Sequence, residues 1–595
     1  MEKQPTGAQK LDAAIALHGA GDLQAAADIY ANLLAERNDN HDAAYGLGTV
    51  RVQLGHAKAA LPLLEQAFHA CPDAPEYAFN RAWALTQLGR NSEAAQGFKH
   101  AATLAAGDIP MLVDICSRLM SLGHNYTAVE ILRPASERAP ESRQVCLALA
   151  IALGRVWDFT AAIATYERAL ALGPGSGKEL MDYADLLFLA KQSEAAKKAI
   201  LQARALGVSS PDALYLEARC ERIAGDLEKV RHLLREAITA RPHFGIAWEL
   251  LLESTADDYL DVVIADCLKL TDDVSAPQHE RAGLLYAAGR AFERLANYER
   301  AFEQFDRANE CQRNATKARG LGYDANDVEQ FIVRMRTDFD VPHEQATTSS
   351  AAEQPIFIVG MPRSGTTVVE RILGGLDGVS ISGECDALEV IASQFYWAQS
   401  HDGAQSARDL VTADWDNMAE QYWRLQTVPK SRATDKMPTN FRHIGLLCAM
   451  FPASPIIYLQ RDPRDVALSI YSRNFADAHY YATELNSLAH FIGASEQLMS
   501  HWKSVYPGRI LDLDYEQLVR EPEPQGQRLA EFCGLSWQPE CLNFHEHADA
   551  SYTFSEVQVR EPLNARGIGR WRRYAESLTP FIDACVANGV QLPDN

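Results

Sequence analysis

One short segment of the chain has the residues of an anion-binding loop. The stretch PIFIVGMPRSGTT, residues 355–367, begins as an apolar run and turns at Gly360 before a helix-like VVERIL. A strand, a small-residue loop and a helix N-terminus direct backbone N–H groups at an anion, and the helix dipole also favours negative charge. We expect this loop to hold a phosphate-like group through Arg363, Ser364, Gly365, Thr366 and Thr367.

The loop differs from a nucleoside-triphosphatase P-loop in the position of its cation. That motif, GxxxxGK[ST], places a Lys directly before the hydroxyl residue. Here Gly365 precedes Thr366, and the cation is Arg363, which comes before the Ser-Gly pair. This arrangement suits a phosphosulfate better than a Mg-bound triphosphate, and it disfavours a nucleotide kinase.

A second cluster follows in IIYLQRDPRDVALSIYSRNF, residues 456–475. We expect a strand that ends at Arg461, a helix that begins near Asp465, and Ser469 about one turn into that helix. Arg supplies a bidentate charged fork and Ser a neutral donor, so the two together can hold a phosphate. The alternative is a turn with surface ion pairs, and the anion loop upstream favours the phosphate site.

The elements that must position these residues alternate between strand-like and helix-like segments. VSIS at 379–382, PIIYL at 455–459 and RILDL at 509–513 have the pattern of short buried strands, with longer helical patterns between them. Such alternation predicts a parallel α/β sheet that binds its ligands at the C-terminal ends of the strands.

The first half of the chain repeats with a period of 34 residues. The phased positions are Ala26, Ala60, Ala94, Ala128, Ala162 and Ala196; Ala67, Ala101, Ala135, Ala169, Ala203 and Ala237; Gly21, Gly55, Gly89 and Gly123; and Pro72, Pro140, Pro174 and Pro242. A unit of this length with small residues where helices touch resembles the tetratricopeptide repeat, which implies a superhelical solenoid. The array is either a groove for a peptide or protein partner, a scaffold for the second half, or an oligomerisation surface.

The pattern divides the chain into three parts. Residues 8–310 form the repeat array, with about nine helix pairs of which seven are regular. Residues 311–354 hold a helical segment and a polar linker, and residues 355–595 form the α/β domain. The expected fold is therefore an α-helical solenoid followed by a P-loop-like domain with a parallel sheet.

Composition narrows the classes of partner and the compartment. The net charge of −23 disfavours binding to nucleic acid or to an anionic membrane surface. No apolar run approaches the roughly 20 residues that a membrane span needs. The 11 cysteines are scattered without a CxxC pair, which favours reduced thiols and a cytoplasmic location. No His, Cys or Asp set has metal-ligand spacing, so we expect no metal.

Together, PRSGTT and the RDPRDVALS that follows about a hundred residues later resemble the sulfotransferase family. Its members use 3′-phosphoadenosine 5′-phosphosulfate (PAPS) as donor. The resemblance covers roughly residues 355–575 and is strongest to the tyrosylprotein sulfotransferases and their bacterial repeat-fused relatives. It implies that the first loop grips the 5′-phosphosulfate and that Arg461 and Ser469 grip the 3′-phosphate.

Further matches extend the resemblance to five more residues. It implies that Glu384, after Gly383, is the catalytic base, and that Lys436 in DKMP donates to the bridging oxygen with help from Ser555 in SEVQV. It implies that Tyr515 in YEQLV contacts the nucleotide and that Arg570 in GRW closes over it. A structural alternative stays open for four of these residues. Glu384 is then a carboxylate stabilised by a helix dipole, and Lys436 a surface lysine. Tyr515 is then packed in the core, and Arg570 belongs to a solvated arginine cluster.

The leading hypothesis is a sulfotransferase that moves a sulfuryl group from PAPS to an acceptor hydroxyl. The acceptor class stays open among a protein tyrosine, a glycan or lipid hydroxyl and a small phenol. The alternative is a repeat scaffold whose C-terminal domain binds nucleotide without turnover.

Overall fold

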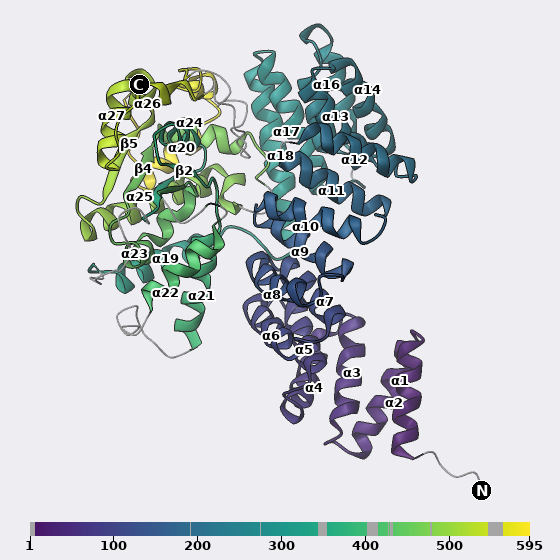
Figure 1. Cartoon of the computed structure of the whole chain (residues 1–595). Helices are drawn as coiled ribbons and strands as arrows, with labels where there is room; N and C mark the ends of the chain where they lie inside the picture. Colours follow the sequence, from purple (N-terminus) through teal and green to yellow (C-terminus); the bar gives the residue numbers. More distant parts are fainter. Residues whose placement is uncertain are drawn as a thin grey trace. The chain divides into compact units, whose positions relative to one another are not determined.

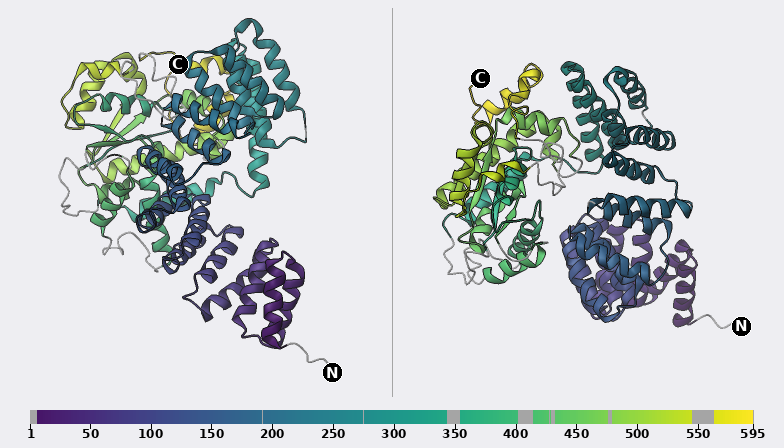
Figure 2. Two further views of the ribbon diagram at one scale, coloured as in Figure 1. Left: turned by 45° about the vertical axis from the view of Figure 1, so that its right-hand side comes forward. Right: turned by 45° about the horizontal axis from the view of Figure 1, so that its top comes forward.

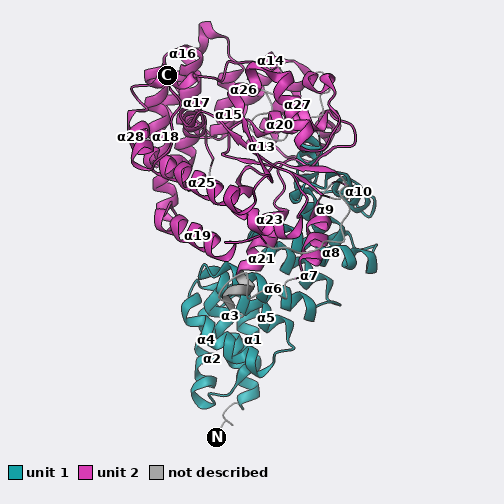
Figure 3. Ribbon diagram, turned by 90° about the vertical axis from the view of Figure 1, so that its left-hand side faces the viewer, with its two compact units in different colours: residues 1–190 teal, residues 191–595 magenta. Residues whose placement is uncertain are grey.

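The computed structural model describes residues 6–190, 192–273, 275–342, 354–401, 414–426, 428, 432–475, 479–544 and 563–594. The chain divides into two compact units, Met1–Ala190 and Lys191–Asn595, which are coloured separately in Figure 3. The second unit therefore contains the end of the repeat array as well as the α/β domain.

The first unit consists of antiparallel helices joined by short turns (Figure 1). These are α1 Gly7–Gly19, α2 Leu23–Glu36, α3 His41–Gln53, α4 Ala57–Ala70, α5 Pro75–Gln87, α6 Asn91–Leu104, α7 Ile109–Ser121, α8 Asn125–Arg138, α9 Arg143–Arg155, α10 Phe159–Ala171 and α11 Gly177–Leu189. The second unit continues the series with α12 Ser193–Ala205, α13 Pro211–Ala224, α14 Leu227–Ala240, α15 Gly245–Glu253, α16 Asp257–Thr271, α17 Gln278–Arg294 and α18 Tyr298–Ala318.

The 34-residue period has a direct structural cause. Every alanine of the two phased series is fully buried, at 0% exposure, where neighbouring helices touch. The phased glycines lie in the turns between paired helices with φ of +73° to +84°, a region that favours glycine because it has no Cβ. Trp157, one period after Gly123, also adopts a positive φ of 65°, so the turn geometry is kept where the residue type changes.

The junction between the array and the next domain is helical. Helix α18 runs on to Ala318, so the boundary expected at residue 310 falls inside this helix. Helix α19, Ala325–Asp338, covers the segment for which the sequence predicts a helix before the linker.

The second half contains a five-stranded parallel sheet in the order β2-β3-β1-β4-β5. Its strands are β1 Ile356–Gly360, β2 Ser380–Ile381, β3 Ala433–Asp435, β4 Ile456–Gln460 and β5 Ile510–Asp514. In register, Phe357 lies opposite Ile456 and Ile457 opposite Leu511. The fold class expected from the sequence is confirmed, and the three-residue strand β3 is an addition to it.

Helices cover both faces of this sheet (Figure 2). They are α20 Thr366–Gly374, α21 Ala387–His401, α22 Trp415–Leu425, α23 Ile444–Met450, α24 Pro463–Tyr471, α25 Leu485–Val505, α26 Tyr515–Arg520, α27 Pro522–Phe532 and α28 Thr579–Ala587, with short 3-10 turns η2 Pro438–His443, η3 Tyr480–Thr483, η4 Pro539–Asn543 and η6 Arg570–Tyr574. Helices α20 and α27 share an apolar core with β1, β4 and β5. On the other face, Phe357 packs against aromatic rings of α22 and of the turn after α23.

A second apolar core joins the last repeats to the α/β domain within the second unit. It contains buried side chains of α13 to α18 together with those of α24, α25 and α28. Among the described residues, no helix has both the length and the apolar character needed to cross a bilayer.

Candidate functional site

The anion loop lies between β1 and α20, at the C-terminal end of the central strand. Arg363 adopts φ 70°, a conformation that costs a non-glycine residue on the order of 1–2 kcal/mol and often marks functional sites. Gly365 has φ 107°, and a Cβ there would lie 2.4 Å from the Tyr515 ring. The loop is thus held in a strained shape against an aromatic ring, and only glycine fits at its tightest point.

The two predicted phosphate-binding clusters meet in space. The Nε atom of Arg363 donates a hydrogen bond to Ser469 Oγ at 3.1 Å, between residues 106 positions apart in the sequence. Arg461 Nη1 donates to the Arg363 carbonyl oxygen at 3.0 Å. Helix α24 begins at Pro463, slightly earlier than the sequence predicts, so Ser469 lies near its C-terminal end. The clusters therefore line one site.

Cationic side chains crowd this site. Burial and the neighbouring charges of Arg473, Arg461 and Arg570 lower the pKa of Arg363 to about 9, so the group stays protonated at neutral pH. Burial and nearby charges, Arg290 foremost, also lower the pKa of Arg473. Guanidinium groups this close repel one another, and a bound polyanion relieves the repulsion. Sequence reasoning missed Arg473, which lies just beyond the C-terminal end of α24, four residues after Ser469.

Unsatisfied polar atoms also point to a polar ligand. Ser364 is 1% exposed, and its Oγ has no hydrogen-bond partner among the described residues. The buried Nε atom of Arg461 also has no hydrogen-bond partner among the described residues. Thr366 and Thr367 form the first turn of α20, whose backbone N–H groups lack partners within the helix. These donors fit a phosphate or phosphosulfate group.

Tyr515, which the family resemblance predicts to contact the nucleotide, lies beside the loop. It begins α26, directly after β5. The guanidinium carbon of Arg461 lies 4.7 Å from the centre of its ring. This cation–π contact and the packing on Gly365 hold the ring at the rim of the site.

A lysine and a carboxylate form the second half of the site. The Nζ of Lys436 and the Oε1 of Glu384 are 2.5 Å apart. The Lys436 side chain is 0% exposed and that of Glu384 is 43% exposed. Strands β2 and β3 run in parallel, so the residues that follow them come together at one sheet edge, where Lys436 N–H donates to the Gly383 carbonyl at 2.9 Å. The pair combines a buried proton donor with an accessible proton acceptor.

Two buried acids support this pair, and sequence reasoning identified neither. Glu370 accepts from the Gly383 N–H at 3.0 Å and from the Thr434 hydroxyl at 2.9 Å, and so fixes the turn before Glu384. Asp435 accepts from the hydroxyl of Tyr422 at 2.8 Å and from Asn440 Nδ2 at 3.0 Å. The only sequence signal was the unusual position of these acids within apolar or strand-like segments.

The buried carboxyl of Asp435 gives a testable pH dependence of stability. Burial raises its pKa to about 7, so the folded protein holds a proton that the unfolded chain releases above its ordinary pKa near 4. Its stabilising contribution is complete below pH 4 and is lost as the pH rises towards 7. In Asp435→Asn, which keeps an acceptor oxygen, we expect the slope of unfolding free energy against pH between 5 and 7 to flatten by up to about 1.4 kcal/mol per unit. Denaturant titrations at several pH values test this, and an unchanged slope would contradict it.

Arg570 is paired with a carboxylate and does not belong to a solvated arginine cluster. Its Nε and Nη2 donate to the two carboxylate oxygens of Glu293, on α17, at 2.7 and 2.6 Å. Its charge also contributes to the lowered pKa of Arg363, so it faces the cationic cluster. Ser555, predicted to assist Lys436, lies outside the described residues.

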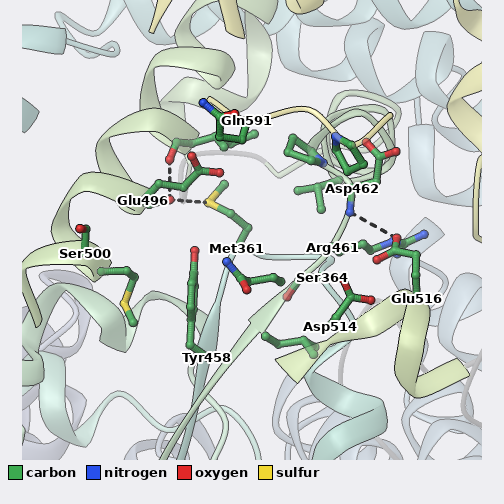
Figure 4. Close-up of a pocket in the computed structure, with 18 of the residues that line it drawn as sticks. Met361, Ser364, Tyr458, Arg461, Asp462, Glu496, Ser500, Asp514, Glu516 and Gln591 are labelled. Atoms are coloured by element: carbon green, nitrogen blue, oxygen red, sulfur yellow. Dashed lines mark hydrogen bonds between the residues drawn. The ribbon is translucent and has the colours of Figure 1, made fainter. Parts of the chain in front are cut away.

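A cavity of about 380 Å³ opens beside the loop, where β4 and β5 end (Figure 4). It shares Ser364 and Arg461 with the anion site, but its remaining charged lining is mostly acidic: Asp462, Glu496, Asp514 and Glu516, with Lys503. Burial raises the pKa of Glu496 to about 7. Carboxylates repel phosphates, so we place an anionic ligand on the Ser469 side of Arg461 and not in this cavity.

Comparison with known proteins agrees with this geometry. Residues 355–539 match the model of the sulfotransferase family. Residues 17–78 match a tetratricopeptide-repeat model. The sulfotransferase match contains the anion loop, the Glu384–Lys436 pair and the Arg461–Ser469 cluster, so the expected family resemblance is confirmed for this domain.

Individual relatives show how far the similarity extends. An uncharacterised protein of Aquifex aeolicus is 30% identical over 62% of this chain and 49% of its own length. The protein-tyrosine sulfotransferase 2 of Gallus gallus is 27% identical over 36% of this chain and 62% of its own length. The chain thus spans less than two thirds of either relative. A solved tetratricopeptide-repeat protein of Parabacteroides merdae aligns with 42% of this chain and 98% of its own at 16% identity and TM-score 0.33.

Proposed function

We propose that this protein transfers a sulfuryl group from PAPS to an acceptor hydroxyl. The observation that carries the proposal is the hydrogen bond between Arg363 and Ser469, which brings together the two clusters that the sequence predicts to bind phosphate. PAPS carries a phosphosulfate and a separate 3′-phosphate, and a site with two linked anion clusters suits both. The similarity of residues 355–539 to the sulfotransferase family supports the same activity.

The chemistry of each side chain indicates its role in the reaction. Donor binding supplies an activated sulfuryl group on a phosphate leaving group. Arg363 and the backbone N–H groups of the loop hold the phosphosulfate, and Arg461 and Ser469 hold the 3′-phosphate. Lys436 stabilises the charge that develops on the leaving oxygen, and Glu384 accepts the proton of the attacking hydroxyl. By analogy with phosphoryl transfer, the rest of catalysis is positioning.

We further propose a protein tyrosine as the acceptor. Proteins of Gallus gallus and Drosophila melanogaster that are similar to part of this chain are named as protein-tyrosine sulfotransferases. The repeat array then offers a scaffold or a groove for the protein that carries the tyrosine.

Binding of the desulfo nucleotide 3′-phosphoadenosine 5′-phosphate (PAP) tests the donor site. We expect calorimetry to show binding by the wild type and roughly 10- to 100-fold weaker binding by Arg461→Ala, because a charged hydrogen bond contributes about 1.5–3 kcal/mol. Arg520→Ala is the matched control, since Arg520 is exposed on α26 and outside the site. Thermal melting of each variant checks that it folds.

Two results would contradict the proposal in different ways. A folded wild type without affinity for PAP would remove the donor assignment. PAP binding without sulfate transfer to any of a panel of tyrosine peptides, glycans and phenols would instead support a scaffold that binds nucleotide without turnover.

A further inference from the structure

The helix that carries Ser469 ends against the repeat array. The last carbonyl groups of a helix lack partners within it. At the end of α24, Asn309 Nδ2 donates to the Tyr471 carbonyl at 2.9 Å, and Arg290 Nη1 donates to the Ser472 carbonyl at 3.4 Å. Both donors belong to the last helix pair of the array, α17 and α18. The array therefore caps the helix that presents a donor-site residue.

Side-chain packing anchors the same contact. The Tyr471 hydroxyl donates to Asp306 Oδ1 at 2.6 Å, and its ring stacks on Phe302 at 5.6 Å between ring centres. The ring of Tyr298 meets that of Tyr574, on η6, edge-on at 5.4 Å. These contacts hold α24 and η6 in a fixed position on α17 and α18.

Within this interface, Glu293 holds Arg570 by both carboxylate oxygens. The side chains are 19% and 27% exposed, so the fork is shielded from water on most sides. A bidentate arginine–carboxylate pair fixes direction as well as distance. The fork uses N–H groups of Nε and Nη2, which leaves the two N–H groups of Nη1 and one of Nη2 for a further acceptor.

The charge of Glu293 also matters for the cationic cluster. Arg570 contributes to the lowered pKa of both Arg363 and Arg473, so the three guanidinium groups interact. Without a paired carboxylate, the Arg570 side chain would have a lower free energy if it turned away from the other guanidinium groups into solvent. The pair with Glu293 offsets this tendency and leaves Arg570 facing the place where the donor phosphates belong.

We propose that Glu293 is a positioning residue for the donor site, so that the last helix pair of the repeat array completes the site. The inference rests on the proposed function, because it assigns the remaining N–H groups of Arg570 to a donor phosphate. It makes the array part of the binding machinery of the transferase domain and not only a module for partners.

A double-mutant cycle on the full chain tests this proposal with PAP as the probe. We expect Glu293→Gln to weaken PAP binding about fivefold to twentyfold, within the range of coupling between contacting residues. In the Arg570→Ala background the same change should have no further effect. With a tyrosine peptide as the acceptor, Glu293→Gln should raise the KM for PAPS by a similar factor. The kcat measured at saturating PAPS should stay nearly unchanged. Glu303→Gln, an exposed carboxylate on α18, should bind PAP like the wild type.

Each contrary outcome identifies what fails. Wild-type PAP affinity in Glu293→Gln, or in Arg570→Ala, would overturn the positioning role. So would an equal loss of affinity from Glu293→Gln with and without Arg570, because it would reflect a general structural defect. A wild type that binds no PAP would overturn the proposed function and this inference with it, whereas binding with an uncoupled cycle overturns this inference alone.

Discussion

Replacing Glu384 with Gln is expected to lower kcat for sulfate transfer about 10²- to 10⁴-fold, the usual contribution of a positioned general base. The amide keeps the shape of the side chain and can still accept from Lys436 Nζ, which lies 2.5 Å from Oε1 in the wild type. It cannot accept a proton from the acceptor hydroxyl. Steady-state kinetics with PAPS and a tyrosine peptide measure the effect.

We expect this substitution to change the affinity of the donor site only slightly. PAP affinity of Glu384→Gln is expected to stay within about threefold of the wild type, because Glu384 pairs with Lys436 and its charge is the smallest of those that shift the pKa of Arg363 in the loop. Glu523→Gln, an exposed carboxylate on α27, is the matched control and should keep full activity. Full activity in Glu384→Gln would show that another group takes the proton.

The second large effect is expected at Lys436. Lys436→Met should lower kcat by about 10²- to 10³-fold, comparable to the loss of one preorganised donor to a developing anion. Lys436 is 0% exposed, so methionine, of similar length, fills most of its volume. Single-turnover transfer from labelled PAPS isolates this step from product release.

The melting temperature of Lys436→Met shows whether a loss of activity comes from the reaction step or from a folding defect. Removing one partner of an ion pair is costly when the other charge stays buried, but Glu384 is 43% exposed and can be solvated. We therefore expect the melting temperature of Lys436→Met to be equal to or above that of the wild type. A folded Lys436→Met that transfers sulfate at the wild-type rate would exclude Lys436 from the reaction.

Periodic small residues made the repeat array predictable from the sequence. Alanine at a fixed spacing has one simple physical cause, close contact between helices, and the phased alanines are indeed fully buried. The sheet was predictable because β1 and β4 are mostly continuous apolar runs, and β5 alternates the buried residues Leu511 and Leu513 with less buried ones. Strand β3 was not, since its three residues include a buried aspartate that only tertiary hydrogen bonds make acceptable.

The candidate site was predictable where residues follow strands. Arg363 and Arg461 follow neighbouring parallel strands, so their proximity follows from topology alone. The roles of Glu384 and Lys436 in the site came from family resemblance, and the parallel pairing of β2 with β3 gives the geometric reason for the ion pair between them. The fork between Arg570 and Glu293 joins positions 277 apart through packing of a helical repeat on an α/β domain. No local pattern encodes such a contact.

The most direct test of the central claim is transfer of labelled sulfate from PAPS by the purified full chain. The reaction is run against fractionated lysate and tyrosine peptides, with Glu384→Gln in parallel, and the products are identified by mass. The account predicts labelled tyrosine-containing products with the wild type and at least a hundredfold less with Glu384→Gln. A wild type that binds PAP but labels no acceptor, or equal labelling by both proteins, would contradict it.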